Sequence, residues 1–199
     1  MSHYFVNDDK VASKPRKIVY SFNGVDFSLD SDNGVFSKNE LDKGSELLIE
    51  TLLPIHLGRN LLDLGCGIGV IGLTLAYFYP TLNVCFTDVN TRALGLCDAN
   101  AKSLKLSQKV TVLQSDIYTK VEGKFDSIVS NPPIRAGKKV TYEIYRGALE
   151  HLNIGGSLYI VIRKQQGALS VKSYLEQLFG NVTVLAREKG YYILKSTKN

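Results

Sequence analysis

From Asn60 onward the chain alternates short apolar segments with longer segments in which apolar residues recur at helical spacing. This alternation predicts a mainly parallel sheet with helices on both faces. The predicted strands are residues 61–64, 84–87, 110–113, 125–129, 157–162, 182–185 and 191–194. The predicted helices between them are residues 68–79, 92–104, 142–152 and 169–179. Only a Lys189-Gly190 turn separates the last two strands, so they should pair antiparallel.

The residues before this alternating region follow a different pattern. Apolar and polar residues alternate on both sides of Asn23-Gly24, which predicts a hairpin with a tight turn. A segment with helical spacing follows and stops near Pro54. We therefore expect one domain over residues 1–199, with a hairpin-and-helix extension (1–55) on an α/β core (56–199).

The composition, 44% hydrophobic and 22% charged, is ordinary for a globular protein. The first residues are polar and acidic, and the longest mostly apolar run, Val70 to Tyr79, is about half of a membrane span. We expect a soluble, cytoplasmic protein without a membrane partner. The three cysteines form neither a C-x-x-C pair nor a zinc spacing, so no metal is expected.

Residues 61–69 read L-L-D-L-G-C-G-I-G, a predicted strand that runs directly into a glycine-rich turn. Glycines let the backbone approach a ligand closely, and ligands of open parallel sheets bind at the carboxyl ends of the strands. Gly67, Gly69 and Gly72 fit the dinucleotide spacing G-x-G-x-x-G. The same loop also fits acid-x-G-x-G-x-G from Asp63, and an acid beside a pyrophosphate would be unfavourable. The acid-x-G-x-G-x-G interpretation of the loop is therefore favoured over a dinucleotide site.

Two further acids follow predicted strands. Asp88, in F-T-D-V-N, can accept hydrogen bonds from both hydroxyls of a ribose. A dinucleotide also contains ribose, so Asp88 does not distinguish the two interpretations of the glycine loop. Asp116, in Q-S-D-I-Y, can accept from an adenine amino group, with Ile117 packing on the ring. Aspartates at such positions are also common as helix caps and turn residues.

Asn131-Pro132-Pro133-Ile134 comes directly after the predicted strand 125–129. Proline fixes φ, so the turn holds a set shape. The Asn131 side-chain oxygen and the Pro132 carbonyl can then both accept hydrogen bonds from one amino group. Such preorganised acceptors would hold a poorly nucleophilic amine in one orientation and stabilise positive charge that develops on its nitrogen.

The two motifs together resemble those of the class I S-adenosylmethionine-dependent methyltransferases that methylate amino nitrogens. The acid-x-G-x-G-x-G loop resembles their motif I, and Asn131-Pro132-Pro133-Ile134 resembles motif IV, usually N/D-P-P-aromatic. The resemblance implies a Rossmann-like methyltransferase fold, α/β, with a seven-stranded sheet in the order 3-2-1-4-5-7-6 and the last strand antiparallel. It also implies that Asp63 interacts with the cationic methionine part of the cofactor. Ile134 departs from the aromatic of the motif, so Phe36, Tyr142 and Tyr145 become candidates for stacking on the target.

A more specific resemblance covers about Tyr4 to Leu194. The segments H-Y-F, S-K-P-R-K, G-V-F-S, L-D-K-G-S and N-P-P-I-R-A-G-K resemble the small-domain methyltransferases that include the 16S ribosomal RNA guanine-N2 methyltransferases. Larger members carry a second, N-terminal copy of the domain that helps to bind RNA, and this chain resembles the single-domain members. The catalytic residues implied are Asn131, Pro132, Pro133 and Ile134. The cofactor-binding residues implied are Phe36, Ser37, Asp63, Gly65, Cys66, Gly67, Gly69, Asp88, Val89, Asp116, Ile117 and Asn131.

The net charge of +5 permits binding to a polyanion. Two basic clusters are expected on the rim of the site, Lys14, Arg16 and Lys17 in one and Arg135, Lys138 and Lys139 in the other. The expected partner is RNA, 16S ribosomal RNA or a small-subunit ribosomal particle, with guanine N2 as the target.

Four alternatives stay open on the sequence. A glutamine-amide (N5) methyltransferase would share the Asn-Pro-Pro turn but would prefer an aromatic after it. A DNA adenine methyltransferase usually needs a target-reading domain, and a nicotinamide-dependent dehydrogenase gives Asn131 no role. A non-enzymatic RNA-binding module would tolerate loss of Asn131.

Overall fold

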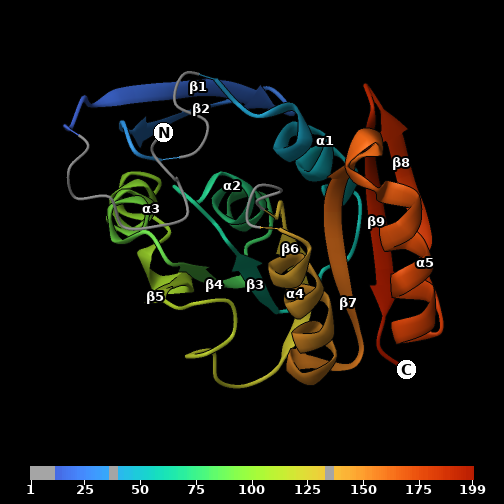
Figure 1. Cartoon of the computed structure of the whole chain (residues 1–199). Coiled ribbons are helices and arrows are strands. Elements are labelled where there is room, and N and C mark those ends of the chain that lie inside the picture. Colours follow the sequence, from blue (N-terminus) through green and yellow to red (C-terminus); the bar gives the residue numbers. More distant parts are fainter. Residues whose placement is uncertain (1–11, 36–39, 133–136) are drawn as a thin grey trace.

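A seven-stranded sheet organises the protein, and a computed structural model describes residues 12–35, 40–132 and 137–199 (Figure 1). The strands lie in the order β5-β4-β3-β6-β7-β9-β8. Their bounds are β3 Asn60–Leu64, β4 Asn83–Asp88, β5 Val110–Gln114, β6 Phe125–Ser130, β7 Leu152–Arg163, β8 Thr183–Glu188 and β9 Tyr191–Thr197. Strands β3 to β7 pair in parallel, and β9 is antiparallel to both of its neighbours. This is the predicted order 3-2-1-4-5-7-6, so the predicted fold class is confirmed.

Helices cover both faces of this sheet (Figure 1). Their bounds are α1 Lys43–Leu52, α2 Val70–Phe78, α3 Thr91–Ser103, α4 Lys138–His151 and α5 Ala168–Phe179. One buried cluster joins α1, α2 and α3 to one face, and a second joins α4 and α5 to the other. Strand β3 contributes Leu61 to the first cluster and Leu62 to the second, because successive side chains of a strand point to opposite faces.

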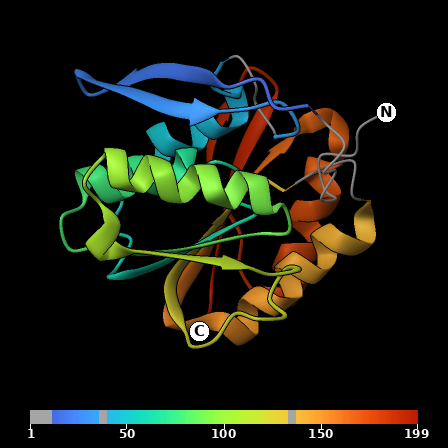
Figure 2. The ribbon, with the colours of Figure 1, turned by 90° about the vertical axis from the view of Figure 1, so that its left-hand side faces the viewer.

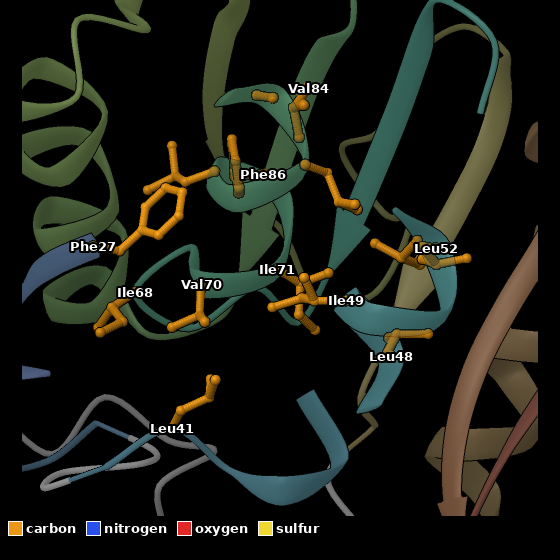
Figure 3. Close-up of a cluster of buried hydrophobic side chains, with 14 of the residues drawn as sticks. Phe27, Leu41, Leu48, Ile49, Leu52, Ile68, Val70, Ile71, Val84 and Phe86 are labelled. Carbon is orange, nitrogen blue, oxygen red and sulfur yellow. The ribbon is translucent and has the colours of Figure 1, made fainter. Parts of the chain in front are cut away.

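A two-stranded hairpin, β1 Arg16–Phe22 and β2 Val25–Ser31, forms a third layer outside the helices (Figure 2). Asn23 and Gly24 both have positive φ, 48° and 75°, as the predicted tight turn requires. The Phe27 ring lies against the edge of α2 in Figure 3, and the buried side of the hairpin belongs to the same cluster as α1 to α3. Burial of this apolar side holds the hairpin on the core.

Helix α1 connects this extension to the core. Asp42 caps its N-terminus by accepting hydrogen bonds from the backbone N–H groups of Gly44 and Ser45. Its buried side faces α2, and Figure 3 shows Ile49 of α1 beside Ile71 of α2. The first residues of α1 are thereby placed over the carboxyl end of the sheet.

The largest differences from the predicted bounds are at the starts of α4 and β7. Helix α4 begins at Lys138, four residues before the expected start at Tyr142, because exposed lysines continue a helix as readily as apolar residues do. Strand β7 begins at Leu152 and runs through Gly155 and Gly156, where a register shift against β6 absorbs the glycines. A Cβ on Gly156 would lie 3.0 Å from two β6 carbonyl oxygens, so glycine allows this close approach.

None of the helices in the described part of the chain is long and apolar enough to cross a membrane. Within the same residues, no group of three His, Cys, Asp or Glu side chains is placed to hold a metal ion. Cys97 is buried, Cys66 and Cys85 are half-buried, and all three are free thiols.

Candidate active site

The segments that carry the predicted site residues meet at the carboxyl edge of the sheet. Strands β3, β4, β5 and β6 are parallel neighbours, so their carboxyl ends lie together. Asp63 of β3 is the register partner of Val129 of β6, which places Gly65 and Asn131 at the same level just beyond the two strands. The glycine loop and the Asn-Pro corner are therefore adjacent, as the sequence predicts.

The glycines of the loop fall into two pairs. Gly65 and Gly67 have positive φ, 72° and 56°, and a Cβ on either would meet nothing within 4 Å. At Gly69 and Gly72, a Cβ would lie 2.7 and 2.4 Å from buried side chains. The first pair leaves open space beside the backbone, as a ligand requires, whereas the second pair is required by packing.

Asp88, at the end of β4, holds this loop in place. Its Oδ2 accepts from the Gly67 backbone N–H at 2.9 Å, and its Oδ1 accepts from Asn90 N–H at 2.9 Å. The Gly65 N–H donates to the Thr87 carbonyl at 2.8 Å. Burial raises the pKa of the Asp88 carboxyl. The sequence predicted a ribose acceptor here, and the loop-holding contacts were not foreseen.

Asp63 lies beneath the loop and is 1% exposed. Its Oδ2 accepts from the Gly72 backbone N–H at 2.8 Å, while its Oδ1 is buried without a hydrogen-bond partner in the described structure. Burial, with a smaller contribution from the Asp88 charge, raises the pKa of Asp63 to about 7. An unpartnered buried carboxylate oxygen is costly, so the site is suited to a cationic or hydrogen-bond-donating ligand.

The smaller cofactor-binding candidates also lie at this edge. Cys66 follows Gly65 in the loop, and burial raises the pKa of its thiol, which keeps it neutral. Val89 is half-buried after β4, and its carbonyl accepts from Gln114 Nε2 at 3.2 Å.

The turn after β5 contains Asp116 and Ile117. Asp116 is exposed, and Ile117 has a positive φ of 49°. A β-branched residue in this region is strained, and such strain collects at ligand sites. Ser115 fixes the turn, because its hydroxyl donates to the Ile117 carbonyl and accepts from the Lys120 N–H. The sequence pattern gives no signal for this strain.

Asn131 follows β6 and contacts the start of α1. Its Nδ2 donates to Asp42 Oδ2 at 2.9 Å and to Ser45 Oγ at 3.0 Å. Pro132, the next residue in the chain, is buried. The other predicted residues of these segments lie outside the described residues: Phe36, Ser37, Pro133, Ile134 and Arg135. Sequence reasoning did not pair Asn131 with α1, since the partners are more than eighty positions away.

The segment after the hairpin is also held at this edge. The Asn90 side chain donates to the Gly34 carbonyl at 3.0 Å, and Arg92 donates to the Asn33 carbonyl at 3.0 Å. Val35, one residue before the undescribed segment 36–39, is 1% exposed. Gly34 and Val35, from the predicted G-V-F-S segment, therefore lie next to the end of β4.

The basic residues occupy two places. Lys138 and Lys139 are exposed in the first turn of α4, after Gly137, and that turn contains no acid. Lys14 and Lys17 are exposed at the end of the hairpin that leads toward Asp32 and Arg92, with half-buried Arg16 between them. Lys17 forms an exposed ion pair with Asp30 at 3.0 Å.

Two of the aromatic residues predicted as candidates for stacking pack against other parts of the protein. Tyr145 is completely buried in the core beneath α4, so it cannot stack on a substrate in this structure. Tyr142 packs on Tyr174 of α5, with ring centroids 4.2 Å apart.

The sheet order and the glycine loop at its carboxyl edge define the class of protein, that of the Rossmann-like methyltransferases. The chain belongs to the methyltransferase small domain family, whose pattern matches residues 26–195.

Two similar proteins differ in length. The chain is 42% identical over 198 residues to the uncharacterized protein YbxB of Bacillus subtilis, and the match covers 98% of both chains. It is 36% identical to ribosomal RNA small subunit methyltransferase C of Erwinia tasmaniensis, covering 83% of this chain and 48% of that one. The chain therefore spans about half the length of that methyltransferase.

A solved structure with a similar fold is the T. thermophilus 16S rRNA N2 G1207 methyltransferase in complex with AdoMet and guanosine. The TM-score is 0.82 at 27% identity, and the match covers 93% of this chain and 51% of that one.

Proposed function

We propose that the protein is an S-adenosylmethionine-dependent N-methyltransferase that acts on an exocyclic amino group of RNA, guanine N2 of 16S ribosomal RNA. The observation that carries the proposal is the position of Asn131, level with Gly65 on adjacent parallel strands. An amine held at Asn131 would lie beside whatever ligand the glycine loop binds. The family and the names of the relatives support methyl transfer to ribosomal RNA.

The residues at the loop fit S-adenosylmethionine. Open space beside Gly65 and Gly67 leaves room for a ligand against the backbone, and the unpartnered Asp63 oxygen suits a cationic one. Asp88 would accept from the ribose, and Asp116 and Ile117 would contact the adenine. When bound, the cofactor supplies a methyl group on a positively charged sulfur. No metal is required for this chemistry.

The chain's own contribution to the reaction is orientation. The Asn131 side-chain oxygen and the Pro132 carbonyl would accept hydrogen bonds from the two hydrogens of the substrate amine. This grip points the nitrogen lone pair at the methyl group and stabilises the positive charge that develops on nitrogen. After transfer the nitrogen would lose one of its two amine protons to water, and the oxygen that accepts from that hydrogen would hold it until then.

The positions of Lys138 and Lys139 support an RNA substrate. Cations in the first turn of a helix oppose its dipole, so these lysines weaken α4 locally. A phosphate at the same place would be attracted by both the lysines and the helix N-terminus. With Arg135, they would engage the RNA backbone beside the target, and Lys14, Arg16 and Lys17 would extend this surface.

The test uses methyl-labelled S-adenosylmethionine with 16S ribosomal RNA, both naked and in small-subunit particles, from cells lacking this activity. The expected product is N2-methylguanine. Label in adenine or cytosine would overturn the target base, and label in a protein would favour glutamine-amide methylation instead. Absence of transfer to any of these substrates would contradict an enzymatic role.

Asn131→Ala should abolish transfer while cofactor binding, measured by calorimetry, stays within a few-fold of wild type. Asn60→Ala is the matched control, because Asn60 is an exposed asparagine at the opposite end of β3. Equal turnover of the Asn131 and Asn60 variants would refute the role of the Asn-Pro corner.

A further inference from the structure

We infer that Asp42 and Ser45, at the start of α1, are positioning residues: they fix the Asn131 amide so that its oxygen, and not its NH2 group, is directed at the substrate. The inference deepens the proposed function and rests on it. Asp42 and Ser45 belong to the L-D-K-G-S segment, which the proposed mechanism has not used so far.

The need for such a device follows from the shape of an asparagine side chain. The oxygen and the NH2 group occupy nearly equivalent positions on a planar amide, and rotation about the terminal bond exchanges them. Only the oxygen can accept a hydrogen bond from a substrate amine. The rotated amide would present its own donors to the donors of the substrate. An asparagine that accepts from an amine must therefore be held in one of the two orientations.

The contacts around Asn131 select one orientation. Nδ2 lies 2.9 Å from Asp42 Oδ2 and 3.0 Å from Ser45 Oγ. An ionised carboxylate can only accept, so the amide atom next to it must be the NH2 group. Rotation would bring the Asn131 oxygen against a negative charge and break both hydrogen bonds. The oxygen therefore points away from α1, and no described residue donates a hydrogen bond to it.

Asp42 is itself held rigidly. The same Oδ2 atom accepts from the Gly44 N–H and the Ser45 N–H, each at 3.0 Å. The Asp42 carbonyl also accepts from Glu46 N–H at 2.9 Å, the first hydrogen bond of the helix. Because α1 packs on α2 through a buried face, the cap transmits the fixed position of the helix to the amide.

Helix capping and amide orientation can be separated by substitution. Asp42→Asn keeps an oxygen that can cap α1, since asparagine caps as well as aspartate. It removes the charge, so the hydrogen bond from Asn131 Nδ2 to the capping oxygen becomes a weaker, neutral one and a rotated Asn131 amide no longer meets a negative charge. Ser45→Ala keeps the backbone N–H that Asp42 caps and removes only the hydroxyl that Asn131 contacts. The matched control is Thr51→Ala, near the other end of α1. It removes a part-buried hydrogen bond that the Thr51 hydroxyl donates to the Leu47 carbonyl at 2.7 Å, away from Asn131.

The experiment measures kcat, the KM for RNA, cofactor affinity and melting temperature of these full-length variants. We expect kcat to fall about 5-fold in Ser45→Ala, which loses one neutral hydrogen bond, and roughly 10-fold in Asp42→Asn, in which a charge-assisted hydrogen bond becomes a neutral one. Cofactor affinity and melting temperature should change no more than in Thr51→Ala, whose kcat should equal that of wild type. Ser45→Thr, which keeps a hydroxyl, should restore most of the kcat. A kcat within 2-fold of wild type in both Asp42→Asn and Ser45→Ala would overturn the inference.

A second measurement does not depend on the substrate. In ¹⁵N-labelled protein the Asn131 side-chain NH2 signals, assigned by their loss in Asn131→Ala, should exchange with water at least 10-fold more slowly than in Ser45→Ala. Equal exchange rates would overturn the inference even if RNA is methylated. Slow exchange together with an inactive wild-type protein would instead overturn the proposed function, so the two failures are distinguishable.

Discussion

The buried Asp63 makes cofactor binding depend on pH in a direction that the structure fixes. Its pKa is raised to about 7 in the free protein, so the carboxyl is mostly protonated below neutrality. S-adenosylmethionine carries a cationic sulfur and, at these pH values, a cationic α-amino group. It should therefore bind the ionised form preferentially, and binding should expel the proton from Asp63.

The size of the effect follows from that pKa. The ionised fraction of a group with a pKa of 7 is about 1% at pH 5 and about 50% at pH 7. Affinity should therefore rise roughly 50-fold between these pH values and level off above them, which is about 2.3 kcal/mol of binding free energy. The α-amino group of the cofactor, with a pKa of about 7.7–8.0, stays mostly charged over this range and does not oppose the trend.

Isothermal titration calorimetry from pH 5 to pH 7, in buffers of different ionisation enthalpy, measures both affinity and proton release. We expect release of about 0.9 proton per site at pH 6 for wild type. Asp63→Asn should bind weakly and with little pH dependence; any slope that remains belongs to Asp88, whose pKa burial also raises. An affinity that changes less than about 3-fold, or the same slope in Asp63→Asn, would refute the reasoning.

Other substitutions test the parts of the site separately. Gly72→Ala places a Cβ 2.4 Å from a buried aromatic ring and should cost about 1–3 kcal/mol of unfolding free energy, measured by urea denaturation. Gly67→Ala meets open space, so it should cost only about 1–2 kcal/mol of stability from its positive φ while a cofactor titration shows the larger loss. Asn100→Ala removes three hydrogen bonds between a buried side chain and the backbone, one accepted from the Asp30 N–H of β2 and two donated to the carbonyls of Asp30 and Ile68, and should destabilise by about 2–3 kcal/mol in the same denaturation assay. Replacing Lys138 and Lys139 by Ala should reduce the slope of log affinity against log salt by about 1–2 in RNA-binding titrations, and an unchanged slope would count against the rim.

The strands and helices of the core could be predicted because their determinants are local and periodic, whereas their order in the sheet was implied by the resemblance to the class I methyltransferases. Each strand of the core is a short apolar run bounded by turn residues, and alternation with helices restricts parallel connections to few topologies. The hairpin was predictable for a similar reason, since Asn23-Gly24 accepts the positive φ of its turn. The bounds of α4 and β7 were less accurate, because neither exposed lysines nor a glycine bulge leaves an apolar period to follow.

The site was predictable at the level of its motifs but not of its contacts. Glycines after a strand indicate that a ligand approaches the backbone closely, and an Asn-Pro turn predicts a rigid backbone corner. The partners of Asn131 lie on α1, and no local pattern connects residues so far apart in the sequence. Asp88 illustrates the same limit: its position was correct, while its bond to Gly67 depends on how two strands meet. The ligand roles of these residues stay predictions until they are tested.

The hydrogen bond between Asp42 and Asn131 determines at which stage of folding the two parts of the site form. The glycine loop is held by hydrogen bonds to Thr87, Asp88 and Asn100, none of them more than 32 positions away in the sequence. The amide corner, in contrast, needs the two ends of an 89-residue separation to meet. A partly folded chain would thus bind S-adenosylmethionine before the Asn131 amide is oriented toward it. Docking of α1 would then complete the site for methyl transfer.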